Sequence, residues 1–114
     1  MILREIKTLT GPWLDYAVYV SESVRNVAVS KPIFVLAAEP DTGKDWYSPS
    51  MKPEHCWHII ERVQPTLYPN RKPDQAATPM AIVSGVAADG PTYLIAFCRA
   101  YAQATLGRML ECPE

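Results

Sequence analysis

Two histidines and a cysteine lie close together near the middle of the chain, and imidazole nitrogen and thiolate sulfur are common zinc ligands. The cluster is His55, Cys56 and His58, with Glu61 three residues further on. On a helix His55 and His58 share a face, whereas Cys56 points with the apolar residues. Because a closed zinc site needs four ligands, we interpret the three as a surface histidine, a partly buried histidine and a core thiol, and we expect no metal.

The segment Ala38–Asp45, with the sequence AEPDTGKD, is similar to a degenerate phosphate-binding loop. The full motif is G-x-x-x-x-G-K-[ST] and opens a helix. Here Asp45 replaces the magnesium-binding hydroxyl, and Glu39 and Asp41 would repel a phosphate. A turn around Gly43 explains the segment better, so we expect no nucleotide and no other cofactor.

Other arrangements of reactive side chains do not appear in the sequence. There is no G-x-S-x-G and no H-E-x-x-H motif, and no spacing assembles a catalytic triad or a pair of carboxylates. We therefore expect no catalytic residues and do not favour an enzyme.

Arg99 stands in a segment that is otherwise apolar almost all round. A guanidinium there must reach water, a carboxylate or a partner. One interpretation is an ion pair with Asp15, Glu61 or a helix C-terminus, and it is favoured because buried charges are usually paired. The other is an anchor for a carboxylate or phosphate of a partner.

Arg71 and Lys72 form a small basic spot in the polar, proline-rich segment Pro69–Pro79. Together with Arg62 and Lys52 they could contact a phosphate backbone. So few positive charges supply only weak, salt-sensitive affinity. The favoured interpretation is therefore a solvated loop.

Tyr47 opens the sequence Tyr47-Ser48-Pro49-Ser50. The favoured interpretation is a helix entry, with Ser50 as the N-cap and Tyr47 packing as a staple-like contact. The alternative is a contact between an exposed Tyr47 and a partner.

Three helices are expected from the spacing of apolar residues and from proline and glycine positions. The first covers Pro12–Val24, with Thr10 or Gly11 as its cap. Its carboxylates Asp15 and Glu22 fall off the apolar stripe, and Asp15 is placed in the first turn, where it suits the helix dipole. The second covers Met51–Val63, with an apolar stripe of Cys56, Ile59, Ile60 and Val63.

The third helix has the strongest pattern, because it is apolar almost all round and must be central to the fold or lie in an interface. It is expected to be capped by Asp89 or Gly90, to begin at Pro91 and to stop at Gly107. A homodimer that buries this helix is one possible form.

Strands are expected between the helices. Ile33–Ala37 is a continuous apolar run that predicts a buried strand. Leu67-Tyr68 is a short strand or edge, and Met80–Val86 is a strand in which Gly85 makes a bulge or turn. The pattern predicts an α+β fold, with three helices packed on a small, mostly antiparallel sheet, in a single domain over residues 1–114.

Composition limits the classes of partner. The chain has 114 residues, 11 Lys and Arg, 12 Asp and Glu, and a net charge of −1, which argues against a general electrostatic attraction to nucleic acid or anionic membranes. Its 3 cysteines include no C-x-x-C pair, so a disulfide framework is not expected. No apolar stretch approaches the roughly 20 residues of a spanning helix, and no signal-peptide pattern is visible. We expect a cytoplasmic protein.

Three blocks of sequence together resemble the NinX-type proteins of tailed phages and prophages, a family of uncharacterised function. The resemblance covers residues 8–113. It implies a small phage- or prophage-encoded accessory protein in a bacterial host, and it brings no catalytic residues. The blocks are Leu9-Thr10-Gly11 with Leu14–Val18, then Tyr47–Ser50 with Ile59–Arg62, and then Pro91–Ala96 with Arg99-Ala100-Tyr101 and Leu106-Gly107.

These observations favour a non-catalytic protein-interaction module that binds a host or phage protein. The first alternative is a nucleic-acid-binding accessory factor, and the second, least favoured, is an enzyme. Partner contacts are expected at Arg99, Tyr47, Arg62, Arg71 and Lys72, and the nucleic-acid alternative adds Lys52.

Overall fold

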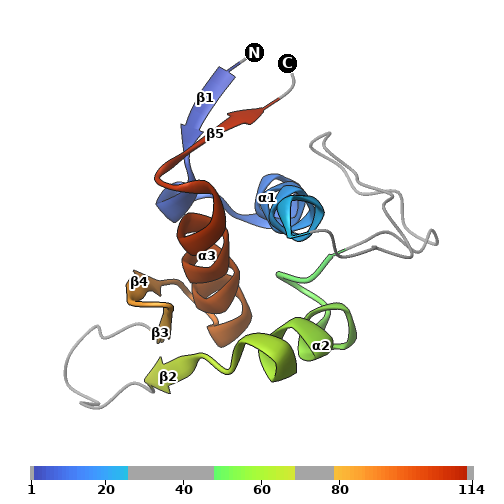
Figure 1. Cartoon of the computed structure of the whole chain (residues 1–114), viewed down its shortest axis with the longest axis vertical. Coiled ribbons are helices and arrows are strands. Elements are labelled where there is room, and N and C mark those ends of the chain that lie inside the picture. Colours follow the sequence, from blue (N-terminus) through green and yellow to red (C-terminus); the bar gives the residue numbers. More distant parts are fainter. Residues whose placement is uncertain (1, 26–47, 69–78, 113–114) are drawn as a thin grey trace.

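The computed structural model describes residues 2–25, 48–68 and 79–112. These parts contain three α-helices and two small antiparallel sheets, so the predicted α+β class is confirmed (Figure 1). Several predicted features lie outside the described residues: the strand Ile33–Ala37, the loop Ala38–Asp45, Tyr47, Arg71 and Lys72.

Helix α3 (Tyr93–Leu106) occupies the centre of the fold (Figure 1). It packs closely against α1 (Gly11–Val24) and the short 3-10 helix η1 (Ile6–Thr8). It also contacts the strands β3 (Met80–Val83), β4 (Val86–Asp89) and β5 (Met109–Cys112). Contacts within its own chain account for much of its apolar character, and a homodimer that uses α3 stays a prediction. The buried residues of α3 are Ile95, Ala96, Phe97, Cys98, Ala100, Tyr101 and Ala102.

The ends of α3 differ in how well the sequence predicted them. Thr92 is the N-cap, and its hydroxyl accepts the Ile95 N–H at 3.2 Å. The predicted cap at Asp89 or Gly90 is wrong, because Asp89 ends a strand and Gly90 lies against Ile95, where a Cβ would approach Cγ2 to 2.8 Å. Gly107, with a φ of 90°, does end the helix, as predicted.

Helix α2 (Pro53–Val63) buries the predicted apolar stripe, with Cys56 and Ile59 in the core and Ile60 and Val63 packed against it. Its N-cap position is occupied by Lys52. The prediction that Ser50 caps the helix is therefore wrong. The Ser50 N–H instead donates to a carboxylate of α1.

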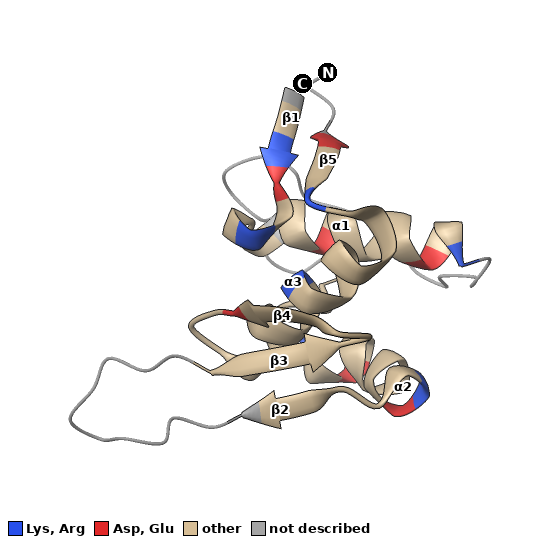
Figure 2. Cartoon of the chain, turned by 60° about the vertical axis from the view of Figure 1, so that its left-hand side comes forward, with Lys and Arg blue, Asp and Glu red and all other residues tan. Residues whose placement is uncertain are grey.

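A three-stranded sheet lies beside α3 and α2 (Figure 2). Its strands β2 (Thr66–Tyr68), β3 (Met80–Val83) and β4 (Val86–Asp89) are antiparallel and follow one another in space. Ser84 and Gly85 have φ values of 50° and 82° and connect Val83 to Val86. Two positive φ values are typical of a tight type I′ hairpin, so Gly85 makes a turn.

A second sheet joins the two ends of the described chain. Strand β1 (Ile2–Glu5) pairs antiparallel with β5 (Met109–Cys112), from Ile2 opposite Cys112 to Glu5 opposite Met109 (Figure 1). The sequence predicted one small sheet and did not predict these strands. Each is only four residues long and includes charged residues, so neither shows the apolar alternation of a half-buried strand.

Charges of both signs are spread over several elements in the view of Figure 2. None of the helices described in the structure is long and apolar enough to cross a bilayer.

Candidate functional site

Helix α1 carries two buried carboxylates on the face that meets α2. Asp15 is 2% exposed and Glu22 is 0% exposed. They are seven residues apart, which is two turns or about 10 Å along a helix, so they share one face. The sequence placed them off the apolar stripe of α1, but it did not predict their burial. Asp15 also lies beyond the first turn of the helix, contrary to expectation.

Asp15 is bound by neutral donors. The Ser48 hydroxyl donates to its Oδ2 at 2.9 Å, and the Ser50 N–H donates to its Oδ1 at 2.9 Å. Both serines are 2% exposed. Burial raises the pKa of Asp15, because the loss of water outweighs these hydrogen bonds and the nearby His55. Asp15 therefore fixes the segment that enters α2.

The histidines and the cysteine that suggested a zinc site have separate surroundings. His55 is half-buried and its Nδ1 accepts the Ser48 N–H at 2.9 Å, Cys56 is buried, and His58 is exposed. Burial and the adjacent Cys56 raise the pKa of the Cys98 thiol. Within the described ranges, no three His, Cys, Asp or Glu side chains come together as metal ligands.

Glu22 has charged and polar partners from two other helices. The Tyr101 hydroxyl of α3 donates to Glu22 Oε1, and Arg62 Nη2 of α2 donates to the same oxygen. Arg62 Nη2 also lies 3.3 Å from the Tyr101 hydroxyl. The second oxygen, Glu22 Oε2, is buried and has no hydrogen-bond partner among the residues that the structure describes. Glu22 therefore ties α1, α2 and α3 together through one carboxylate.

The surroundings of this cluster fix its protonation state. Burial and the bond to Glu22 raise the pKa of Tyr101 to about 12. Burial opposes the charge of Arg62, but the Glu22 carboxylate outweighs it and raises the pKa of Arg62. At neutral pH the phenol is therefore protonated and the guanidinium is charged.

Arg25 completes the cluster from the end of α1. Its guanidinium carbon lies 5.0 Å from the centre of the Tyr101 ring, which is close enough for a cation–π contact. Its Nε donates to Thr105 Oγ1 at 2.8 Å. The Tyr101 ring is itself stacked on Phe97, with centroids 5.9 Å apart. Arg25 is thus positioned by α3.

Both arginines line one pocket of about 380 Å³, which we name the Arg25–Arg62 pocket. Its described walls come from the ends of α1 and α2 and from the β3–β4 turn. The guanidinium groups of Arg25 and Arg62 and the Glu22 carboxylate behind them together carry a net charge of about +1 when all three are ionised. Guanidinium groups bind carboxylate and phosphate oxygens in a bidentate manner. The lining residues are Arg25, Arg62, Val63 and Ser84.

Arg99, the most distinctive residue of the sequence, is held by two backbone carbonyls. Its Nε donates to Leu9 O at 2.9 Å and its Nη1 donates to Asp89 O at 2.8 Å. Burial lowers its pKa despite the nearby charge of Asp89. These partners differ from the carboxylates of Asp15 and Glu61 that the sequence suggested. The geometry gives Arg99 a structural role, in which it links α3 to β4 and to the segment before α1.

The structure brings one of the predicted contact residues to the pocket, namely Arg62. Arg99 is not among its lining residues, and Tyr47, Arg71 and Lys72 lie outside the described residues. Sequence reasoning missed Arg25 and Ser84. The glycine after Ser84 did indicate a turn, but nothing in the sequence placed that turn beside Arg62.

Searches for similar proteins add no assignment to this geometry: no protein-family model and no curated protein matches the chain. The resemblance to NinX-type proteins stays a prediction. A function must therefore be inferred from the pocket and its charges.

Proposed function

We propose that this chain is a small, non-catalytic interaction module that binds an acidic segment of a partner protein at the Arg25–Arg62 pocket. In this proposal a carboxylate of the partner is bound between the two guanidinium groups, and an adjacent apolar side chain packs on Val63. The resemblance to NinX-type proteins extends the proposal to a phage or prophage accessory protein in the cytoplasm of a bacterial host.

One observation carries this proposal: Arg62 of α2 and Arg25, which directly follows α1, both contact the same buried tyrosine, Tyr101, and line the same pocket. Each already has a defined partner, Glu22 for Arg62 and Thr105 for Arg25. A side chain that is already ordered loses less conformational entropy when it binds. Preorganised arginines are also enriched among residues that dominate binding energy.

The surroundings of the pocket support a protein partner over a nucleic acid. A phosphate backbone is bound by a succession of cations, whereas the described lining has two, with a carboxylate behind them. Val24, next to Arg25, is 59% exposed and Val63 lines the pocket. Apolar residues beside arginine are typical of protein interfaces.

Fluorescence polarisation with short labelled peptides tests the proposal. One peptide carries glutamate and leucine residues, and its matched control replaces each glutamate by glutamine. We expect the acidic peptide to bind more tightly, and we expect Arg25→Gln to weaken that binding about tenfold, the effect of losing one charge-assisted bond. Lys7→Gln removes the same charge near the other end of α1 and should leave binding unchanged.

Two results would contradict the proposal. One is equal affinity for the acidic and neutral peptides. The other is tighter binding of a single-stranded DNA oligomer than of the acidic peptide, with a steep loss between about 50 mM and about 200 mM salt, which would favour the nucleic-acid alternative.

A further inference from the structure

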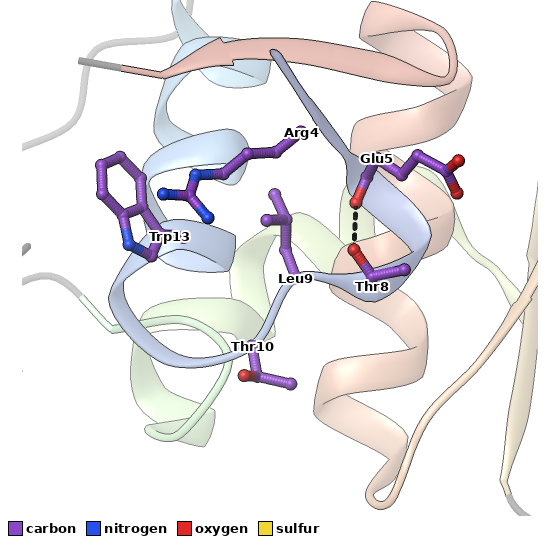
Figure 3. A pocket seen from close by; sticks show the side chains of 6 residues that line it. All are labelled: Arg4, Glu5, Thr8, Leu9, Thr10 and Trp13. Carbon is purple, nitrogen blue, oxygen red and sulfur yellow. Dashed lines mark hydrogen bonds between the residues drawn. The ribbon is translucent and has the colours of Figure 1, made fainter. Parts of the chain in front are cut away.

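A second pocket lies at the opposite end of α1 from the Arg25–Arg62 pocket. It has a volume of about 450 Å³, within the usual range for small-molecule sites. We name it the Arg4–Trp13 pocket (Figure 3). It is formed where β1, η1 and the start of α1 meet, and its described lining consists of Arg4, Glu5, Thr8, Leu9, Thr10 and Trp13.

Arg4 is the cation of this pocket, and an aromatic ring holds it. Its guanidinium carbon lies 4.7 Å from the centre of the Trp13 ring. Figure 3 shows the guanidinium beside Trp13, on the side away from the Glu5 carboxylate. That carboxylate lies 3.6 Å from Lys7 Nζ. Among the described residues, Arg4 therefore has no carboxylate partner.

The hydrogen bonding of Arg4 is incomplete. Its Nε is buried and has no hydrogen-bond partner within the described part of the chain. A buried donor without a partner is costly, and charged groups are costlier still. An oxyanion on the outer Nη nitrogens would compensate the charge of this partly desolvated group. Bidentate binding at these nitrogens is the usual way in which arginine recognises a carboxylate.

The rest of the pocket offers both hydroxyl groups and apolar surface. Thr8 Oγ1 donates to the Glu5 backbone carbonyl at 2.8 Å, so its lone pairs remain for a ligand donor. The Thr10 hydroxyl does not bond the first turn of α1. Leu9, which is 5% exposed, and the Trp13 ring provide an apolar wall.

We propose that the Arg4–Trp13 pocket binds a small organic monocarboxylate, with its carboxylate on the Arg4 Nη nitrogens and its hydrocarbon part against Leu9 and Trp13. A single cation matches a single negative charge. A doubly charged phosphate would be repelled more strongly by Glu5 at the edge of the pocket. This site does not depend on the Arg25–Arg62 pocket.

An NMR titration with sodium benzoate tests the site. The signals to follow are the Arg4 Nε–H and the Trp13 indole N–H, which is identified by its loss in Trp13→Phe. We expect both to shift saturably with benzoate, and not with benzamide, its neutral isostere. Weaker saturation by inorganic phosphate supports the monocarboxylate, whereas tighter binding of phosphate would overturn it.

Variants distinguish binding of benzoate at Arg4 from binding at other cationic side chains. Arg4→Gln should raise the Kd for benzoate at least about tenfold, and Arg4→Lys should raise it less, because lysine keeps the charge but loses the bidentate geometry. Arg25→Gln should leave the Kd unchanged. If Arg4→Gln loses its dispersed amide spectrum, Arg4→Lys provides the comparison. An unchanged Kd in the folded Arg4 variants, or equal shifts with benzamide, would overturn the proposal.

Discussion

Helix α1 buries one carboxylate toward each of its ends, and the two carboxylates have different hydrogen-bond partners. At one end, Asp15 is surrounded by serine donors that are themselves buried. At the other, Glu22 is paired with Arg62, whose side chain is 39% exposed and lines a pocket. Both ends hold α2 against α1, but the second keeps a charged group at the surface.

This difference separates a buried carboxylate that only holds the fold together from one that also positions a cation for binding. Asp15 and the serines that bind it are all buried, so this cluster presents no charged group at the surface. At Glu22 the carboxylate fixes Arg62 in position without cancelling the combined charge of Arg62 and Arg25. The same buried acid that holds the helices together thus preorganises a cation for binding.

The largest expected effect on stability comes from removing the charged partner of Glu22. Arg62→Met should lower the free energy of unfolding by about 3 kcal/mol, because Glu22 would be left buried without a counter-charge. Urea unfolding measures the change, with Glu61→Gln on the exposed face of α2 as the control. A loss below about 1 kcal/mol, the value of an ordinary surface ion pair, would show that Glu22 does not need Arg62.

Disrupting the hydrogen bonds of Asp15 should lower the free energy of unfolding by a smaller amount. Asp15→Asn keeps the shape but turns an amide N–H₂ toward a donor, so we expect a loss of about 2 kcal/mol in unfolding free energy. The same urea experiment measures it. A neutral or stabilising change would contradict the hydrogen-bonded role of Asp15.

The contribution of Asp15 to stability should depend on pH, and the direction of its pKa shift gives the sign. The pKa of Asp15 is raised in the folded state, so its contribution to stability is fully present below the unfolded pKa, near 3.8, and is lost as the pH rises through the folded pKa. Relative to Asp15→Asn, the wild type should therefore gain stability as the pH falls. Parallel unfolding curves across this range check the sign, and an opposite trend would contradict a carboxyl group destabilised by burial.

Much of the fold was predictable, because helical periodicity does not depend on distant residues. Helix α3 and the apolar stripe of α2 follow from their own residues. The β1–β5 pairing does not, because it joins opposite ends of the chain. The burial of Asp15 and Glu22 was equally hidden, since it depends on where α2 docks.

The candidate site was less predictable than the fold. Arg62 was identified as a cation, but its pairing with Glu22 depends on the approach of two helices. Arg25 immediately follows a helix, and its sequence neighbours give no sign that Tyr101 lies beside it. Arg99 is the opposite case, because its place in an apolar helix made it conspicuous in the sequence. In the structure its guanidinium is bound by two backbone carbonyls.

A smaller effect on stability is expected when the hydroxyl group of Tyr101, which contacts both arginines, is removed. Tyr101→Phe should lower the free energy of unfolding by about 1 kcal/mol, because Glu22 loses one hydrogen bond while the packed ring remains. In the wild type, tyrosinate absorbance should include one group that ionises near pH 12, and this group should be missing in the variant. Stability due to Tyr101 should be lost as the pH rises from about 10 through that value. If the group that the variant loses ionises near pH 10 instead, the bond to Glu22 is contradicted.

The smallest effect on stability is expected at Arg25. Arg25→Gln should change the free energy of unfolding by less than about 0.5 kcal/mol, because exposed polar contacts contribute little. Thermal unfolding measures this change. A large loss would make Arg25 a structural residue like Asp15 and would remove the contrast between the two ends.

The central claim is that the exposed arginines of the Glu22 end receive an acidic partner. Its most direct test is an NMR titration of arginine Nε–H signals with the glutamate-rich peptide. We expect saturable shifts of the Arg25 and Arg62 signals, whereas the signal of Arg99, which is bound to backbone carbonyls, should not shift. Binding that leaves the Arg25 and Arg62 signals unmoved would contradict it.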